Sequence, residues 1–519
     1  MTYAKRLVLI AFAAALSVCG PVSLYAQDAG EGATRMIRDP ATEEMYNRGM
    51  QLLAEEKPKE ALSEFNGALT ADPTYVEAYI GRGDALLAIE DYPAAIISYS
   101  RAIEIDQNSA AAYNGRGEAS LKVGQIDAAS TDFTQALQLA PNNPKILSNL
   151  GHVLINYARE PQGALRRLND AIAGNDQDAR AFRDRGFAHA MLQDFEAAEA
   201  DLRRAAEIEP ENYENYAVMA NIFLFQENVP GAIEALGRAI AAYKPEKPAD
   251  PKIYLMGYLS RADAWLRVGD EEKDQQRSQA AYQNAIADAE FVIRDNPDRF
   301  PEAGMAYFRK GRAQRMLQQF SEAVDSLTLA LETIPPGQEA NYVSDAYMYR
   351  GICWYYIGSH DLARGDFEQA SAVGSGFNDP RVYLWIGFTH HQEGDYRDAI
   401  KAYSEAIAKA PKFALAHTNK GRAYMDLEEY NNAIESFNDA IRSEPSVGEH
   451  YYNVGFAYAQ LGDWTKAEHF LNIALRKKNP EPKMYRLMAT VLRERGRDEL
   501  ADEYEQKADA AQPQQAAGQ

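Results

Sequence analysis

Cysteine and basic residues are both scarce in this chain. Two of the 519 residues are cysteine, which excludes a disulfide framework, a multi-cysteine zinc site and an iron–sulfur site. Lys and Arg number 54 against 76 Asp and Glu, so the net charge is −22. A surface this acidic repels phosphate backbones, and we therefore expect no nucleic-acid partner. The 46% hydrophobic and 25% charged residues are nevertheless ordinary for a folded protein.

Long apolar runs are also missing, apart from one near the N-terminus. Residues 7–18 are apolar, follow Lys5 and Arg6, and precede a small residue at Ala26. The run is shorter than the roughly 20 residues that cross a bilayer. This order of charged, apolar and small residues predicts a signal peptide over 1–26 and an exported protein, periplasmic or secreted.

A lipid anchor is the alternative interpretation of the same segment. Residues 16–19 resemble a lipobox, in which Cys19 would carry the lipid, although Val18 stands where a smaller residue is usual. No later stretch is apolar enough to span a membrane, so we expect no membrane span in the mature chain.

The rest of the chain repeats one pattern. Glycines recur 34 residues apart, at Gly49, Gly83, Gly117 and Gly151 and again at Gly387, Gly421 and Gly455. Most are followed at a fixed distance by an alanine, a bulky apolar residue, a second alanine and a proline, as in Ala129, Phe133, Ala136 and Pro141. The spacings of four and three place these residues on one face of a helix. Each unit therefore reads as helix, short turn and helix.

This period and its small residues resemble the tetratricopeptide repeat (TPR) family. The resemblance covers roughly 42–515 and implies an all-α fold, a right-handed α-solenoid of about 13 helix-turn-helix units. We expect a flexible linker over 27–41, six units over 42–246, seven units over 255–515, and a disordered tail over 516–519.

One unit departs from the pattern. A proline-rich seam over 247–254 precedes it, and its two alanines, Ala262 and Ala285, are 23 residues apart instead of 12. The 11 extra residues include the polar run 270–277, which lengthens the two helices or forms an exposed loop. The seam is either a hinge or a surface insertion of the kind that solenoids tolerate.

Two positions of the repeat vary together. The residue before the small residue of the repeat is basic in eight units, and the residue 16 positions later, or 27 in the unit with the insertion, is then acidic or serine, as in Arg116 and Asp132. Where the first residue is apolar, as at Met219, the second is never acidic, as at Ala235. We interpret the pair as a bond between the two helices of a unit. The aromatic residue four before the glycine, such as Tyr113, is expected to fill the core.

In the TPR family the first helix of each unit lines an inner groove that binds extended peptides or helices. The resemblance therefore implies a non-enzymatic scaffold that binds a protein or peptide segment. The lining positions of the N-terminal block are polar and include Asp84, Asn114, Glu118, His152, Arg183 and Asn221. Those of the C-terminal block are aromatic and basic, and our candidates are Phe308, Arg312, Arg315, Met348, Tyr355, Phe388, His391, Arg422, Tyr452 and Phe456. Such residues commonly anchor interfaces, so we expect a partner with apolar anchors and an acidic group.

Enzyme chemistry finds little support in the sequence. We predict no catalytic residue, no cofactor and no metal site. The adjacent His390 and His391 point in different directions from a helix, and Cys353 lies in an apolar stretch typical of a buried residue. Two further hypotheses stay open: a lipid-tethered assembly subunit of an envelope machine, and a glycan-processing accessory or an enzyme of unrecognised type.

Overall fold

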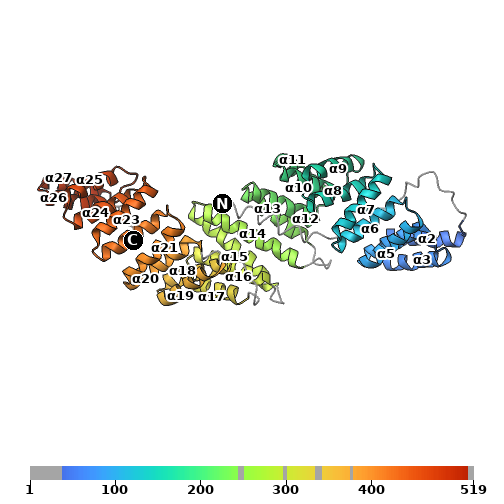
Figure 1. Ribbon diagram of the computed structural model, residues 1–519, viewed down its shortest axis with the longest axis horizontal. Helices are drawn as coiled ribbons and strands as arrows, with labels where there is room; N and C mark the ends of the chain where they lie inside the picture. The colour runs from blue at the N-terminus through green and yellow to red at the C-terminus, as the bar shows by residue number, and fades with distance from the viewer. Residues whose placement is uncertain (1–37, 244–250, 296–300, 334–341, 375–377, 512–519) are drawn as a thin grey trace. The chain divides into compact units, whose positions relative to one another are not determined.

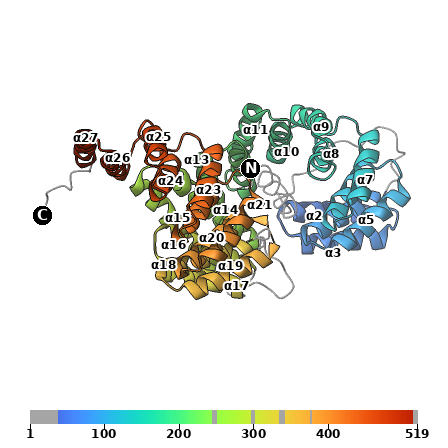
Figure 2. The same cartoon turned by 60° about the vertical axis from the view of Figure 1, so that its left-hand side comes forward.

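The computed structural model describes residues 38–243, 251–295, 301–333, 342–374 and 378–511. These residues form 26 α-helices and no strand. The helices pack in chain order as antiparallel pairs, which confirms the predicted all-α solenoid of about 13 units (Figures 1 and 2). The predicted signal peptide, Cys19, most of the linker and the tail lie outside the described residues.

The chain divides into two compact units, unit 1 (1–264) and unit 2 (265–519). The helices of unit 1 are α2 (Pro40–Ala54), α3 (Pro58–Ala71), α4 (Val76–Ala88), α5 (Tyr92–Ile105), α6 (Ala110–Lys122), α7 (Ile126–Leu139), α8 (Pro144–Asn156), α9 (Pro161–Gly174), α10 (Ala179–Met191), α11 (Phe195–Ile208), α12 (Tyr213–Phe225) and α13 (Val229–Ala242). The boundary between the units falls within α14 (Pro251–Glu271). Of the seam predicted over 247–254, the first four residues lie outside the described residues.

Unit 2 continues the same alternation of first and second helices. Its helices are α15 (Gln275–Arg294), α16 (Pro301–Met316), α17 (Phe320–Glu332), α18 (Val343–Ile357), α19 (His360–Ala372), α20 (Pro380–Glu393), α21 (Tyr396–Lys409), α22 (Ala414–Asp426), α23 (Tyr430–Ser443), α24 (Gly448–Gln460), α25 (Trp464–Leu475), α26 (Pro482–Glu494) and α27 (Asp498–Ala510). The inserted residues lengthen α14 to 21 and α15 to 20 residues, whereas α12 has 13 and α13 has 14. The insertion thus extends both helices of its pair.

One residue with positive φ sets the turn between the two helices of a repeat, except in the described turn between α14 and α15. Gly394 and Gly462 adopt φ values of 84° and 75°, and Glu90 adopts 64° at the same place in its own repeat. The next residue begins the second helix, and Asp91 and Asp463 each accept a hydrogen bond there from a backbone N–H of the first turn. This side-chain cap satisfies a donor that the helix leaves unpaired.

The large core side chain of most repeats comes from the second helix, and it is an aromatic ring in some repeats and a leucine, such as Leu168, in others. Phe65 of α3 is fully buried, and a Cβ added at Gly49 of α2 or at Gly81 of α4 would lie 2.6 Å from its Cε1 atom. One ring is therefore held between the first helices of two successive repeats. This contact explains why the glycines recur and why each repeat depends on its neighbour for stability.

The predicted bond between the two helices of a repeat is present with both kinds of partner: Arg82 Nε donates to the Ser98 hydroxyl at 3.0 Å, and other arginines donate to an aspartate. In α6 and α7, the Arg116 Nη2 and Nε atoms donate to Asp132 Oδ1 and Oδ2 at 2.7 and 2.8 Å. The same bidentate bond joins Arg185 to Asp201 and Arg350 to Asp366.

The repeat with Lys310 differs from this prediction. Lys310 pairs with Glu290 at 2.8 Å, while Ser326 donates to Gln314 at 2.7 Å. A lysine has a single flexible donor group, so it is not held to the fork geometry that an arginine imposes.

The aromatic residue four before the glycine is buried in some repeats, as predicted for Phe182 and Tyr216, and half-buried in others, where the prediction that it fills the core is wrong. Tyr79 and Tyr113 are half-buried, and the guanidinium groups of Arg82 and Arg116 lie 5.0 and 5.6 Å from their ring centroids. These rings form an outer layer that supports the arginine of each helix-to-helix bond.

Candidate functional site

The first helices of successive repeats contact one another directly. In unit 2 the contacting pairs are α16 with α18, α18 with α20, and α24 with α26, and in unit 1 they include α4 with α6 and α8 with α10. Helices that lie close together across repeats occupy the inner side of a curved stack, so the first helices supply the face predicted to bind a ligand. All ten predicted site residues belong to first helices of unit 2.

The N-terminal end of this face is a stack of rings beside a cation. The Phe308 ring of α16 stacks on Tyr342 and Tyr349, with centroids 5.1 and 5.9 Å apart. The Arg315 guanidinium lies 4.6 Å from the centroid of the Tyr349 ring. Phe308 and Arg315 of α16 therefore both contact Tyr349 of α18. The sequence pattern did not predict this contact between successive first helices.

A second group of rings surrounds Trp385 of α20. Tyr355 and Phe388 contact its indole edge-on, with centroids 5.5 and 5.2 Å away. Trp385 itself stacks on the buried Phe367 at 5.8 Å. Tyr355 and Phe388 are half-buried, so each presents part of its ring to solvent.

A third group lies on α24. The half-buried rings of Tyr452 and Phe456 stack with centroids 6.3 Å apart, and the Lys483 ammonium lies 5.4 Å from the centroid of the Tyr452 ring. Burial raises the pKa of Tyr452, so its hydroxyl stays protonated at neutral pH.

Acidic partners hold the predicted cations of this face. Arg312 pairs with Asp270, and Arg422 pairs with Glu449 at 2.9 Å. The sequence pattern gave these positions as a basic cluster, but each guanidinium has a carboxylate beside it.

Two predicted residues are positioned differently from the rest. His391 Nε2 lies 2.6 Å from Asp426 Oδ2, which ties α20 to α22. Met348 is 2% exposed and packs in the interior around Phe367, so it presents no surface to a ligand. Met348 and Phe308 both lie three residues before the repeat glycine, so the family pattern predicted that both line the groove. In the structure the Met348 side chain instead turns inward.

The equivalent face of unit 1 is a closed polar network. Asn149 donates to Asn114 Oδ1 and to Glu118 Oε1, both at 2.9 Å, and it accepts from Arg180. Lys145 pairs with Glu118 at 3.0 Å. Burial raises the pKa of Glu118, but Lys145 outweighs it and holds that pKa below its usual range.

The network continues along α10 and α12. His152 Nδ1 lies 2.8 Å from Asp184 Oδ2, and Arg183 pairs with Glu214 at 2.8 Å while donating to Asn215 at 3.1 Å. These polar groups bind one another, so they are satisfied within the protein.

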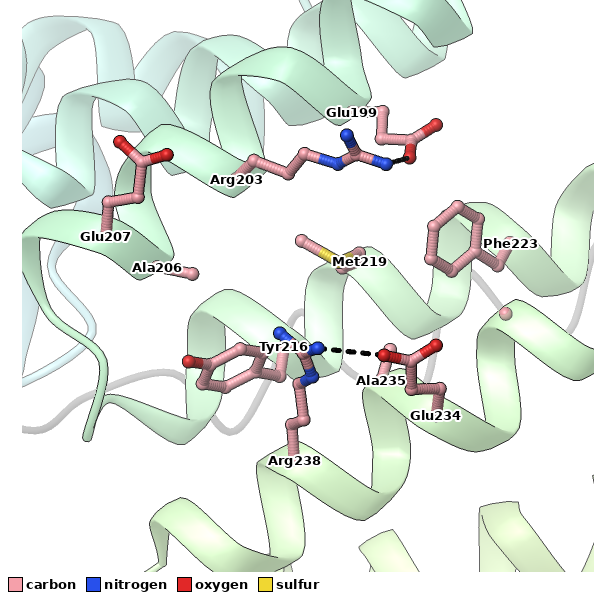
Figure 3. A pocket seen from close by; sticks show the side chains of 11 residues that line it. Glu199, Arg203, Ala206, Glu207, Tyr216, Met219, Phe223, Glu234, Ala235 and Arg238 are labelled. Carbon is pink, nitrogen blue, oxygen red and sulfur yellow. Dashed lines mark hydrogen bonds and ion pairs between the residues drawn. The ribbon is translucent and has the colours of Figure 1, made fainter.

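Unit 1 also holds a pocket of about 390 Å³ that the sequence analysis missed (Figure 3). Its floor is apolar, and Arg203 with Glu199 and Arg238 with Glu234 form ion pairs at opposite edges, at 2.5 and 2.8 Å. The full lining is Glu199, Arg203, Ala206, Glu207, Tyr216, Met219, Phe223, Gly231, Glu234, Ala235 and Arg238.

The pocket occurs where the arginine–aspartate bond of the repeat is replaced by Met219 and Ala235. Both residues are part of the pocket lining. The exception at these two positions was visible in the sequence, but four other units also lack the pair, so it did not by itself locate the pocket.

The structure confirms the prediction that Cys353 is a buried residue. It is 0% exposed, and burial raises the pKa of its thiol to about 12, so the nucleophilic thiolate does not form at neutral pH. Among the described residues, no helix combines the length and hydrophobicity needed to cross a bilayer.

The described residues of each unit form helical pairs that stack repeat on repeat, and this arrangement defines the chain as a solenoid repeat protein. Three tetratricopeptide repeat family models match it: one at 274–339, 390–447 and 418–482, one at 83–124 and one at 110–143. The chain is a multi-repeat protein of the tetratricopeptide repeat family.

Several solved structures are similar to this chain. The Cut9–Hcn1 hetero-tetramer of the APC/C is 14% identical, with a TM-score of 0.36 over 92% of this chain and 95% of that chain. MamA from Desulfovibrio magneticus RS-1 is 18% identical, with a TM-score of 0.29 over 33% and 97%. YrrB, described as a TPR protein with an unusual peptide-binding site, is 24% identical, with a TM-score of 0.30 over 37% and 96%.

Proposed function

We propose that this chain is a non-enzymatic protein-interaction scaffold and that the first-helix face of unit 2 binds a peptide or protein segment. The observation that supports the proposal is the set of three ring groups on that face, centred on Phe308, Trp385 and Tyr452. Half-buried aromatic side chains supply large contact areas at a low entropic cost, so they anchor the apolar side chains of a partner.

The cations of the same face determine which polar group a partner must carry. Arg312 and Arg422 are held by exposed or half-exposed carboxylates, which an acidic group of a ligand can replace. The Arg315 Nε atom makes no hydrogen bond within the described residues. A segment with apolar anchors and one carboxylate, either a side chain or a free C-terminus, matches this arrangement.

The test is capture of a partner from the source cell with the chain 27–519. One variant carries Arg312→Glu, Arg315→Glu and Arg422→Glu. A control variant with the same change in net charge carries Arg101→Glu, Arg204→Glu and Arg442→Glu, which lie on second helices. We expect a captured protein to be lost by the first variant and kept by the control.

Two results would count against this site. A protein that binds both variants equally is recognised elsewhere on the chain. If no protein binds the parent chain, the scaffold function itself fails, and glycan-related or enzymatic roles become the better hypothesis. Circular dichroism of each variant establishes that the repeats remain folded.

We further propose that the chain is exported through the signal peptide over 1–26. The order of Lys5, Arg6, the apolar run 7–18 and Ala26 supports this proposal. The mass of the mature N-terminus tests it: we expect a chain that begins at Gln27. A lipid on Cys19 would instead indicate the tethered assembly subunit, and an intact Met1 would refute export by this signal.

A further inference from the structure

Two repeats carry the same histidine and aspartate at the turn between their helices. In unit 1 these are His189 and Asp194, and in unit 2 they are His390 and Asp395. The Nδ1 atom of the histidine lies 3.5 and 4.0 Å from Oδ2 of the aspartate, respectively. Three residues after the histidine, unit 2 has Glu393 where the unit 1 repeat has a leucine. Only the repeat in unit 2 therefore carries three side chains that can ligate a metal.

The fold brings these three side chains together. His390 and Glu393 are three residues apart in the last turn of α20, so they share one face of the helix. Gly394, with φ 84°, reverses the chain, and the Asp395 N–H donates to the His390 carbonyl at 2.9 Å. The candidate ligand atoms of His390, Glu393 and Asp395 all lie within 4.8 Å of one another.

Two of these ligand atoms lack the bonds that their positions normally make. Asp395 directly precedes α21, but its side chain accepts no hydrogen bond from the helix, whereas the side chains of Asp194 and Asp463 cap their helices from the same position at 3.3 and 3.1 Å. The Nδ1 atom of His390 is buried and makes no hydrogen bond within the described residues. Glu393 accepts a bond from Arg364, a partly exposed side chain that can turn away.

We propose that His390, Glu393 and Asp395 bind a divalent transition-metal ion, with Zn²⁺ as the representative. Zinc takes imidazole nitrogen and carboxylate oxygen at about 2.0–2.2 Å, which places ligand atoms about 3.3 Å apart in a tetrahedron. Rotation of the exposed Glu393 and Asp395 side chains closes the remaining distance.

The donor set and its position favour this class of ion. An imidazole nitrogen selects transition metals over Mg²⁺ and Ca²⁺, which prefer oxygen ligands alone. The C-terminal end of α20 adds the negative end of a helix dipole beside the site. A bound ion would link the last turn of α20 to the first residue before α21 and so stabilise this helical hairpin.

The experiment is isothermal titration of the full chain with ZnCl₂ at pH 7.5. His390→Ala and Asp395→Asn remove one ligand each. His391→Ala is the matched control on the neighbouring residue, and His189→Ala is the control in the same register of unit 1. We expect one equivalent of Zn²⁺ to bind, about tenfold or more weakly in the two ligand variants, as for other losses at metal sites, and with little change in the controls.

A second readout separates this site from weak binding to exposed carboxylates. Zn²⁺ should raise the unfolding temperature of the parent chain but not that of His390→Ala, and the effect should fade towards pH 5.5 because the ligating imidazole must be neutral. The proposal is overturned if the parent chain shows no zinc-dependent shift, if His390→Ala binds as the parent does, or if His189→Ala loses as much. Equal binding of Mg²⁺ would likewise exclude a site defined by the imidazole.

Discussion

The bond between Arg116 and Asp132 allows a direct test of what holds the two helices of a repeat together. Asp132 is 5% exposed and accepts two hydrogen bonds from one guanidinium. The Arg116→Met variant leaves this carboxylate without its partner. An unpaired buried charge costs about 3–5 kcal/mol, and because Arg116 is partly exposed we expect about 2–3 kcal/mol here.

The double variant Arg116→Met/Asp132→Ala distinguishes pairing from packing. It reproduces the combination that the chain itself uses at Met219 and Ala235. Because neither charge is then left alone, we expect its stability to return to within about 1 kcal/mol of the parent. The pair of the exposed Arg48 and the partly buried Glu64, 3.6 Å apart, is the control, and Arg48→Met should cost no more than about 1 kcal/mol because solvent reaches both side chains.

Hydrogen exchange of the α6 and α7 amides is the suitable assay, because repeat arrays do not unfold in one step and a single free energy of unfolding is not defined. The opening free energy of these amides should fall in Arg116→Met and recover in the double variant. If the double variant is as unstable as the single one, the two residues do not act as a pair. If Arg48→Met costs as much as Arg116→Met, burial of the carboxylate is not the reason for the effect.

Two further predictions test the packing and the charge of unit 1. Gly117→Ala should lower the protection of α6 amides by about 1–3 kcal/mol, because its Cβ would lie 2.7 Å from the buried Phe133 ring. Gly365→Ala, where nothing lies within 4 Å of the added atom, should instead stabilise α19 by about 0.5–1 kcal/mol, and equal effects would refute the role of the ring. Burial raises the pKa of Asp84 to about 6, so its contribution to stability is present at low pH and is lost as pH rises from about 4 to about 6. Asp84→Asn should therefore stabilise the chain at pH 7 but not at pH 4 in thermal melts at both values.

The repeat architecture could be predicted because the glycine and alanine spacings are imposed by the core. A Cβ at the repeat glycine would enter the ring of the second helix, so the same small residue recurs wherever the same contact is made. The pairing of Arg116 with Asp132 was predicted for the same reason: one chain shows which residues change together. Both signals arise inside a repeat, where spacing along the sequence determines position in space.

The details of the binding face could not be predicted in this way. Met348 and Phe308 occupy equivalent positions, yet Met348 is buried and Phe308 is half-buried. Contacts across repeats, such as that between Arg315 and Tyr349, depend on how successive first helices cross. The exposure of a lining residue and the partner of a cation are properties of two repeats together, and the spacing within one repeat does not determine them.

Departures from the repeat therefore carry more information about function than the repeat itself. A position that carries the same type of residue in most units has a common role in packing. A unit with a different residue there lacks that role, and its local structure differs. Met219 replaces an arginine, and a pocket appears beside it. Glu393 stands where the related turn has Leu192, and there the candidate ligand atoms of three side chains lie within 4.8 Å of one another. In both cases another repeat of the same chain keeps the usual residue. That repeat shows the local structure without the change and so serves as an internal control.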